Sequence, residues 1–201
     1  MNKIVIGIDQ SYSDTGISVS YNGELKSSTH CYTENLKTNT QKRQQLRTTL
    51  NSVFEKVNTK QRQTGAEIIV IIERIRLRSQ GFLNIDYIKS IGALNALIVD
   101  LSCAYDFPVF SVDTRAWKTA VVGTSKGLSN PFGIDEKKYP TIIWCCKHGY
   151  KNNIINYDVG KRKKGVIEKD GKRYTYNDNI ADSICISLYG FTNNMKLEKE
   201  H

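Results

Sequence analysis

The chain has 201 residues, of which 39% are hydrophobic, so it is long and apolar enough for one domain with a buried core and is not a disordered chain. Its 29 lysines and arginines outnumber its 20 acids, and this formal charge of +9 favours a polyanionic partner such as nucleic acid over a basic surface that serves solubility alone. No run of 18 apolar residues, no signal peptide and no Cys-x-x-Cys pair is present, so we expect a reduced, cytoplasmic protein without a membrane span.

The N-terminal part of the chain predicts three strands. Residues 4–8 are almost all isoleucine or valine and run into Asp9, which is typical of a buried strand. Residues 15–21 alternate apolar and polar side chains, and residues 24–32 form a third plausible strand. Because the link between the first two strands is short and polar, we expect an antiparallel meander at the start of the fold.

The middle of the chain alternates helices with strands. The spacing of apolar residues predicts helices over 40–63 and 84–105, and continuous apolar runs predict strands over 66–72 and 108–112. The strand over 66–72 leads directly into Glu73. After the last of these strands, Asp113 or Thr114 is expected to cap a short helix.

The composition of the sequence changes after residue 123. A loop over 123–133 is followed by a possible helix over 135–147, a β-hairpin over 166–174 with Asp-Gly at its turn, a helix over 177–191 and a flexible tail over 193–201. The order of elements predicts a single α/β domain over 1–192, with a central five-stranded mixed sheet flanked by helices. Residues 124–176 form an insertion before the last helix.

Four carboxylates are placed where they can converge. Asp9 and Glu73 each end a predicted strand, and Asp178 and Asp182 lie one turn apart on the last helix. Carboxylates held close together repel each other, and a divalent cation such as Mg²⁺ relieves that repulsion. Two such ions could act on a phosphodiester from both sides. The alternative for each acid is a turn residue, and Asp178 could simply cap its helix.

Four segments of the sequence, in this order, resemble motifs of the RuvC-type Holliday-junction resolvases. Residues 6–16 are similar to the family's opening Gly-Ile-Asp and Thr-Gly, and residues 71–73 to its second acidic motif. Residues 109–123 resemble a strand and helix that end in Lys-x-x-Val-Val-Gly, and residues 178–183 resemble the final acidic helix. The resemblance spans residues 4–190.

This resemblance implies a ribonuclease-H-like fold, a homodimer and Mg²⁺-dependent paired nicking of four-way DNA junctions, with Mn²⁺ able to substitute. It makes Asp9, Glu73 and Asp182 catalytic metal ligands. The fourth ligand is open, because the family's acid or histidine is replaced here by Asn179 while an acid stands one position earlier, at Asp178. Some phage, poxviral and mitochondrial relatives carry adjacent acids there, so a phage-like variant with Asp178 as the catalytic ligand is favoured.

Several basic and aromatic residues are candidates for DNA contact. Lys118 matches a basic position of the family, and Lys137 matches another more loosely. Relatives carry an aromatic residue three positions after the second acid, whereas this chain has Arg76 there, flanked by Arg74 and Arg78, with Phe82 as the nearest aromatic. This difference favours action on branched DNA in general, including three-way junctions and flaps.

The insertion concentrates positive charge. Residues 147–173 contain nine lysines and arginines against three acids, with Lys161, Arg162, Lys163 and Lys164 at the centre and tyrosines interleaved. Such a segment could grip a DNA arm through its phosphates, and the equal alternative is a solvated loop.

Three other functions remain open. The first is a catalytically silent protein that binds branched DNA, because Asn179 replaces an expected acid. The second is an actin-like phosphate-binding ATPase fragment, because Asp9 with Thr15 and Gly16 also resembles a phosphate loop, although 201 residues are too few for the two halves such kinases need. The third is a zinc module around residues 145–148, which adjacent cysteines disfavour.

Overall fold

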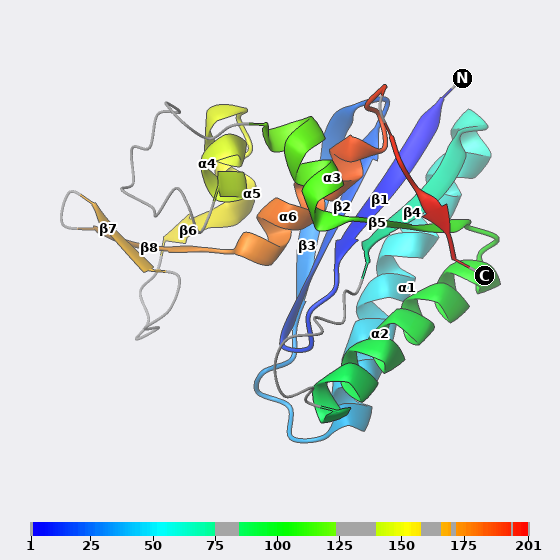
Figure 1. Cartoon of the computed structure of the whole chain (residues 1–201), viewed down its shortest axis with the longest axis horizontal. Helices are drawn as coiled ribbons and strands as arrows, with labels where there is room; N and C mark the ends of the chain where they lie inside the picture. The colour runs from blue at the N-terminus through cyan, green and yellow to red at the C-terminus, as the bar shows by residue number, and fades with distance from the viewer. Residues whose placement is uncertain are drawn as a thin grey trace.

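The computed structural model of the chain describes residues 2–74, 85–123, 140–157, 166–169, 172–193 and 195–200. A six-stranded sheet with helices on both faces forms the centre of this part of the chain (Figure 1). In chain order its strands are β1 (Lys3–Asp9), β2 (Asp14–Tyr21), β3 (Glu24–Tyr32), β4 (Glu67–Glu73), β5 (Val109–Val112) and β9 (Glu198–Lys199).

The sheet is mixed, with the order β3-β2-β1-β4-β5-β9. β1, β2 and β3 form the predicted antiparallel meander, whereas β1, β4 and β5 are parallel neighbours. Because β1 and β4 run in the same direction, their carboxyl ends, which carry Asp9 and Glu73, meet at the same edge of the sheet.

The sheet has six strands where the sequence predicted five. Residues of the expected flexible tail pair with β5, where Ser111 faces Glu198 and Phe110 faces Lys199, and the Glu200 amide donates to the Val109 carbonyl at 2.9 Å. A two-residue, charged strand has no alternation of apolar and polar side chains, so periodicity could not reveal it.

One face of the sheet is covered by two long helices, α1 (Asn39–Thr64) and α2 (Ile85–Ala104). A capping box between Thr38 and Gln41 starts α1, and Gly65 ends it in the left-handed conformation with φ 63°. Large side chains fill the space between these helices and the sheet, among them Ile4, Ile6, Ile8, Ile17, Leu46, Leu50, Phe54, Ile72 and Ile98. This core follows the predicted apolar spacing closely.

The other face is covered by α6 (Asp178–Tyr189), which lies against β1 and β2 at unusually short range. A Cβ atom on Gly7 would overlap backbone atoms of Ser183 and Ser187, and one on Gly16 would overlap the Asn179 carbonyl. The absence of side chains at both glycines therefore sets how closely the helix approaches the sheet.

Two buried serine pairs join the same surfaces. The Ser18 and Ser183 hydroxyls lie 2.7 Å apart, as do those of Ser20 and Ser187. Ser183 and Ser187 also bond to backbone carbonyls of their own helix at 2.8 Å. Because each buried hydroxyl has a partner, these polar contacts fix the position of α6 on the sheet without a desolvation penalty.

Shorter elements extend the α6 side of the molecule away from α1 and α2 (Figure 1). The helical ones are α3 (Thr114–Trp117), the π-helical turn η1 (Lys118–Val122), α4 (Pro140–Lys147) and α5 (Lys151–Ile154). A small antiparallel sheet has the order β6 (Ile155–Tyr157), β8 (Lys172–Tyr176), β7 (Val166–Lys169). The predicted hairpin between β7 and β8 is confirmed, and Asp113 is the predicted cap of α3.

Among the described residues, no helix is both long and apolar enough to span a membrane. All five cysteines are free thiols, and Cys31, Cys145 and Cys185 are buried.

Candidate active site

Three buried or half-buried carboxylates meet where α6 crosses the carboxyl ends of β1 and β4. Asp9 is the last residue of β1, and Glu73 is the last residue of its parallel neighbour β4. The β2 residue opposite Asp9 is Gly16, whose missing side chain lets α6 approach, and this brings Asp182 to the same place. The elements that carry these acids are therefore held together by both the sheet register and the small residues under α6.

The acids influence one another electrostatically. Asp9 is only 9% exposed, and burial, followed by repulsion from Asp182, Glu73 and Asp178, raises the pKa of its carboxyl well above the usual value. Burial and then Asp182 raise the pKa of Glu73 to about 7. Burial likewise raises the pKa of Asp182. All four sequence-predicted acids are therefore close enough to interact, and the charged forms of Asp9, Glu73 and Asp182 are disfavoured.

Lys118 partly offsets this repulsion. Its ammonium lies 3.6 Å from the Asp182 carboxylate and 4.9 Å from the ring centre of the buried Trp117. The lysine lowers the pKa of Asp9, Glu73 and Asp182, against the larger effect of burial. The basic residue that the sequence motif indicated therefore stands inside the acidic site, while Trp117 packs in the core.

Glu73 is held by two residues that the sequence analysis missed. The side-chain amide of Gln10 donates to the Glu73 carbonyl and accepts from the Glu73 amide at 3.1 Å. The Thr114 hydroxyl donates to the Glu73 carboxylate. Since Gln10 directly follows Asp9, its two bonds tie the ends of β1 and β4 together just beyond their last paired residues. A polar residue after a predicted strand was the only signal, and it is a common one.

The start of α6 is fixed by Asn177, not by Asp178. The Asn177 side chain accepts from the Ile180 amide at 2.9 Å and donates to Asp14 at 2.8 Å. Asp14 also contacts the His30 ring at 2.7 Å. Because Asn177 caps the helix, the alternative role of cap for Asp178 is wrong, and this exposed acid contributes instead to the field around Asp9 and Asp182.

The donor atoms suit a hard divalent cation. The acids of the site supply carboxylate oxygens, and the buried Asp182 Oδ1 has no hydrogen-bond partner among the described residues. Among the described residues, no three His, Cys, Asp or Glu side chains are close enough together to hold a metal ion as they stand. Lys118 lies beside Asp182, and Thr114 donates to Glu73. The orphaned oxygen and the mutual repulsion nevertheless fit a cation, which would replace the ammonium as counter-charge.

The structure describes only some of the candidate DNA contacts. Arg74 forms an ion pair with Glu198 of β9, and this contact was not expected from the sequence. Apart from Lys118, the other candidates lie outside the described residues, namely Arg76, Arg78, Phe82, Lys137, Lys161, Arg162, Lys163 and Lys164.

Around the alternative zinc site, His148 stacks on Trp144 with ring centres 4.0 Å apart, whereas the buried Cys145 thiol approaches the Ala181 carbonyl at 3.8 Å.

Comparison with known proteins shows the fold. No protein-family model and no curated protein sequence matches the chain. Among solved structures, Thermus thermophilus RuvC in complex with a Holliday junction substrate matches with a TM-score of 0.52 and 13% identity, over 92% of this chain and 90% of that one. Another structure of RuvC from the same organism matches with a TM-score of 0.50 and 14% identity, over 92% and 91%.

The yeast mitochondrial Holliday junction resolvase Ydc2 is also similar, with a TM-score of 0.45, 15% identity and coverage of 92% and 75%. The two RuvC matches establish that this chain has the RuvC-type, ribonuclease-H-like fold that the sequence motifs predicted.

Proposed function

We propose that this chain, which has the RuvC-type fold, is a metal-dependent endonuclease that nicks branched DNA. One observation carries the proposal. Carboxylates from three separate elements are buried together on this fold, although Asp182 and Glu73 raise the pKa of Asp9 and Asp182 raises that of Glu73, which disfavours the charged forms. A cluster that costs folding stability is typical of a functional site.

Asp9, Glu73 and Asp182 would hold Mg²⁺, with Asp178 as the favoured fourth ligand and Asn179 as a neutral alternative or a residue that supports it. Two ions at such a site would supply Lewis acidity and a water of lowered pKa for hydrolysis of a phosphodiester. Mn²⁺, which accepts the same oxygen ligands, is expected to substitute.

The chain's own residues would prepare the site. Gln10 and Thr114 hold Glu73 in a fixed position, so its carboxylate is already ordered before the substrate binds. Lys118 neutralises Asp182 before the cation binds. With a cation bound beside Asp182, the flexible Lys118 side chain would be free to bind a phosphate oxygen of the DNA.

Branched DNA is the substrate class that the fold and the charge support together. The RuvC protein of similar fold was solved with a Holliday junction substrate, and this chain carries a formal charge of +9. We propose four-way junctions as the main substrate, three-way junctions and flaps as further ones, and a homodimer as the active form, since paired nicks need two sites. The basic residues 161–164 would contact a DNA arm.

A cleavage assay on synthetic DNA tests this proposal. Labelled four-way, three-way, flap and linear duplexes of equal length are incubated with the protein in Mg²⁺, in Mn²⁺ and in EDTA. We expect nicks near the branch in both metals, none in EDTA and none in the linear duplex. Equal cutting of the linear DNA would contradict the branch preference, and cutting in EDTA would contradict the metal site.

The silent DNA-binding alternative rests on Asn179, which stands where relatives carry an acid or histidine. Tight binding of the four-way junction without nicks in either metal would establish it. A band-shift assay on the same DNA, run beside the cleavage assay, separates the two functions.

A further inference from the structure

A groove of about 830 Å³ lies between α1 and the outer strands β2 and β3. Its volume is in the range of natural ligand pockets. Val19 and Tyr21 of β2 and Val53 and Val57 of α1 supply apolar surface, and serines and threonines of β3 and α1 also line the groove. The groove is therefore a preformed, largely apolar depression.

The groove carries positive charge without a carboxylate. Lys26, Lys56 and Lys60 are among its lining residues, and none of the residues that line it is acidic. Lys56 and Lys60 are one turn apart on α1, so their ammonium groups repel each other. Lys26 contacts Glu24 at 2.6 Å, but that carboxylate is 77% exposed and lies outside the lining. An anionic ligand would relieve this repulsion.

The outer edge of β3 forms one side of the groove. β3 has nine residues and, within the described part of the chain, pairs with β2 alone. The amide and carbonyl groups of its outer edge can therefore accept another strand. In a strand added there, every second side chain would face the groove, because successive side chains of a strand point to opposite faces.

We propose that this groove binds an extended acidic segment of a partner protein, with apolar residues at alternate positions. Main-chain bonds to β3 would give affinity, the apolar surface would take the alternate side chains, and the three lysines would select acids. Duplex DNA fits less well, because its surface offers phosphates but no apolar side chains for Val19, Val53 and Val57.

The bound segment would leave the acidic site free. Ile4 borders the groove and stands five residues before Asp9 on β1, which is about 16 Å along an extended strand. Moreover, Ile4 faces the core under α1, whereas Asp9 faces α6. The groove is thus suited to recruiting the protein to a partner, and this inference does not depend on the proposed nuclease activity.

Peptide selection on the full chain tests the proposal. Random twelve-residue peptides displayed on phage are selected against the immobilised protein, and the enriched peptides are synthesised with a fluorescent label. We expect acidic peptides with alternating apolar residues. Their affinity, measured by fluorescence anisotropy, should fall about tenfold or more in Lys56→Glu/Lys60→Glu. The matched control Lys37→Glu/Lys89→Glu makes the same charge change at exposed positions outside the groove and should leave the affinity unchanged.

Hydrogen exchange on the peptide complex should show added protection of β3 amides. The proposal is overturned if no peptide is enriched, if the enriched peptides are neutral or basic, or if the two double variants bind equally. Loss of four-way-junction binding in Lys56→Glu/Lys60→Glu, with unchanged peptide binding, would assign the groove to nucleic acid instead. A circular dichroism spectrum confirms that both variants are folded before binding is compared.

Discussion

Both faces of the central sheet bury apolar side chains, but among the described residues only the α6 face also has close backbone packing and buried hydroxyl pairs. Under α1 and α2, large apolar residues such as Ile6, Ile8 and Phe54 fill a broad core. Under α6, Gly7, Gly16 and two serine pairs bring the helix into contact with the strand backbone. Figure 1 shows the two long helices on one side of the sheet and α6 with the shorter elements on the other.

This difference suggests that the α1 and α2 face mainly stabilises the fold, whereas the α6 face also fixes the position of its helix. Apolar burial stabilises in proportion to area and tolerates small shifts of a helix, whereas close backbone packing and buried hydroxyl pairs permit only one arrangement. The acidic site depends on the α6 face, because Asp182 reaches Asp9 and Glu73 only if α6 lies close to β1. Variants of Asp9 and Gly7 change the α6 face, and matched variants on the α1 and α2 face serve as their controls.

The largest effect is expected from Asp9→Asn. Cleavage of a four-way junction should fall about 10³-fold or more, since the central ligand of the site is lost, while junction binding persists. The metal-free variant should also be more stable than the parent by about 1 kcal/mol, because one of the repelling charges is gone. Asp100→Asn on α2 is the matched control and should change neither quantity. Normal cleavage by Asp9→Asn would refute the site.

Gly7→Ala is expected to destabilise the protein by about 3 kcal/mol, since the added methyl group forces α6 away from β1. Ile6, the preceding residue on the same strand, faces the opposite core, and Ile6→Val should cost only about 1 kcal/mol. Urea unfolding of both variants measures the two values. Equal values would mean that the α6 face has no greater need for close packing than the α1 face.

Gln10→Ala should weaken Mg²⁺ binding about 10- to 100-fold, because Glu73 loses the side chain that fixes its backbone. The expected signature is a higher Mg²⁺ concentration for half-maximal cleavage, with a nearly normal rate at saturating metal. Gln10→Glu can still accept from the Glu73 amide but cannot donate to its carbonyl, so it serves as the close control. An unchanged metal dependence in Gln10→Ala would show that the two bonds are dispensable.

The smallest effect is a pH dependence of several degrees in the Tm of the metal-free protein. The pKa of Glu73 is raised to about 7, so the folded state holds a proton that the unfolded state releases near 4.5. The contribution of Glu73 to folding stability should therefore be highest below about pH 4.5 and should decline as the pH rises through about 7. Saturating Mg²⁺ should reduce that decline, and Glu73→Gln should flatten it. A Tm that rises over this interval in EDTA would contradict the assignment.

The sequence predicted most of the central fold because its strands and long helices bury apolar side chains at regular spacing. It also placed Asp9 and Glu73 correctly at strand ends, and the structure shows that these strands are parallel neighbours whose carboxyl ends meet. Gln10 and Thr114 could not be found in this way, because their role depends on hydrogen bonds between segments distant in sequence. Asn177, rather than Asp178, caps α6, and both residue types are good caps, so only the geometry distinguishes them.

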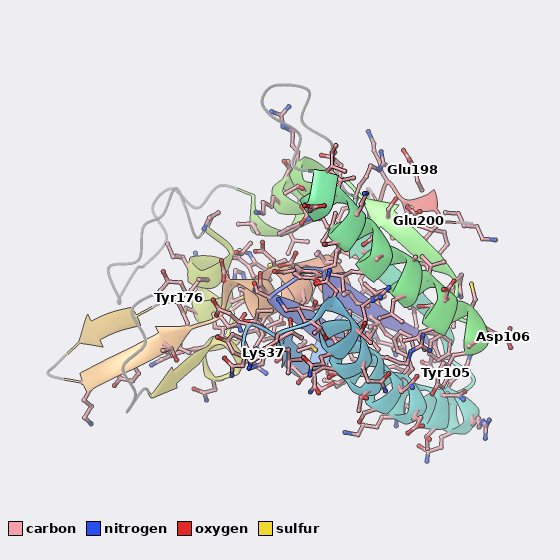
Figure 2. All side chains as sticks on the ribbon, turned by 90° about the horizontal axis from the view of Figure 1, so that it is seen from below. Lys37, Tyr105, Asp106, Tyr176, Glu198 and Glu200 are labelled. Carbon is pink, nitrogen blue, oxygen red and sulfur yellow. The ribbon has the colours of Figure 1, made fainter. Side chains whose placement is uncertain are left out.

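β9 covers one edge of the central sheet and so limits where another strand can be added. The outer edge of β5 is occupied by β9, and Glu198 of this strand and the adjacent Glu200 lie at the margin of the molecule (Figure 2). At the opposite edge, β3 has no second partner strand among the described residues. If both edges were available, copies could join edge to edge without end and form fibrils. With one edge closed by charge, strand addition ends after a single partner, so a complex formed through β3 should have a fixed one-to-one stoichiometry.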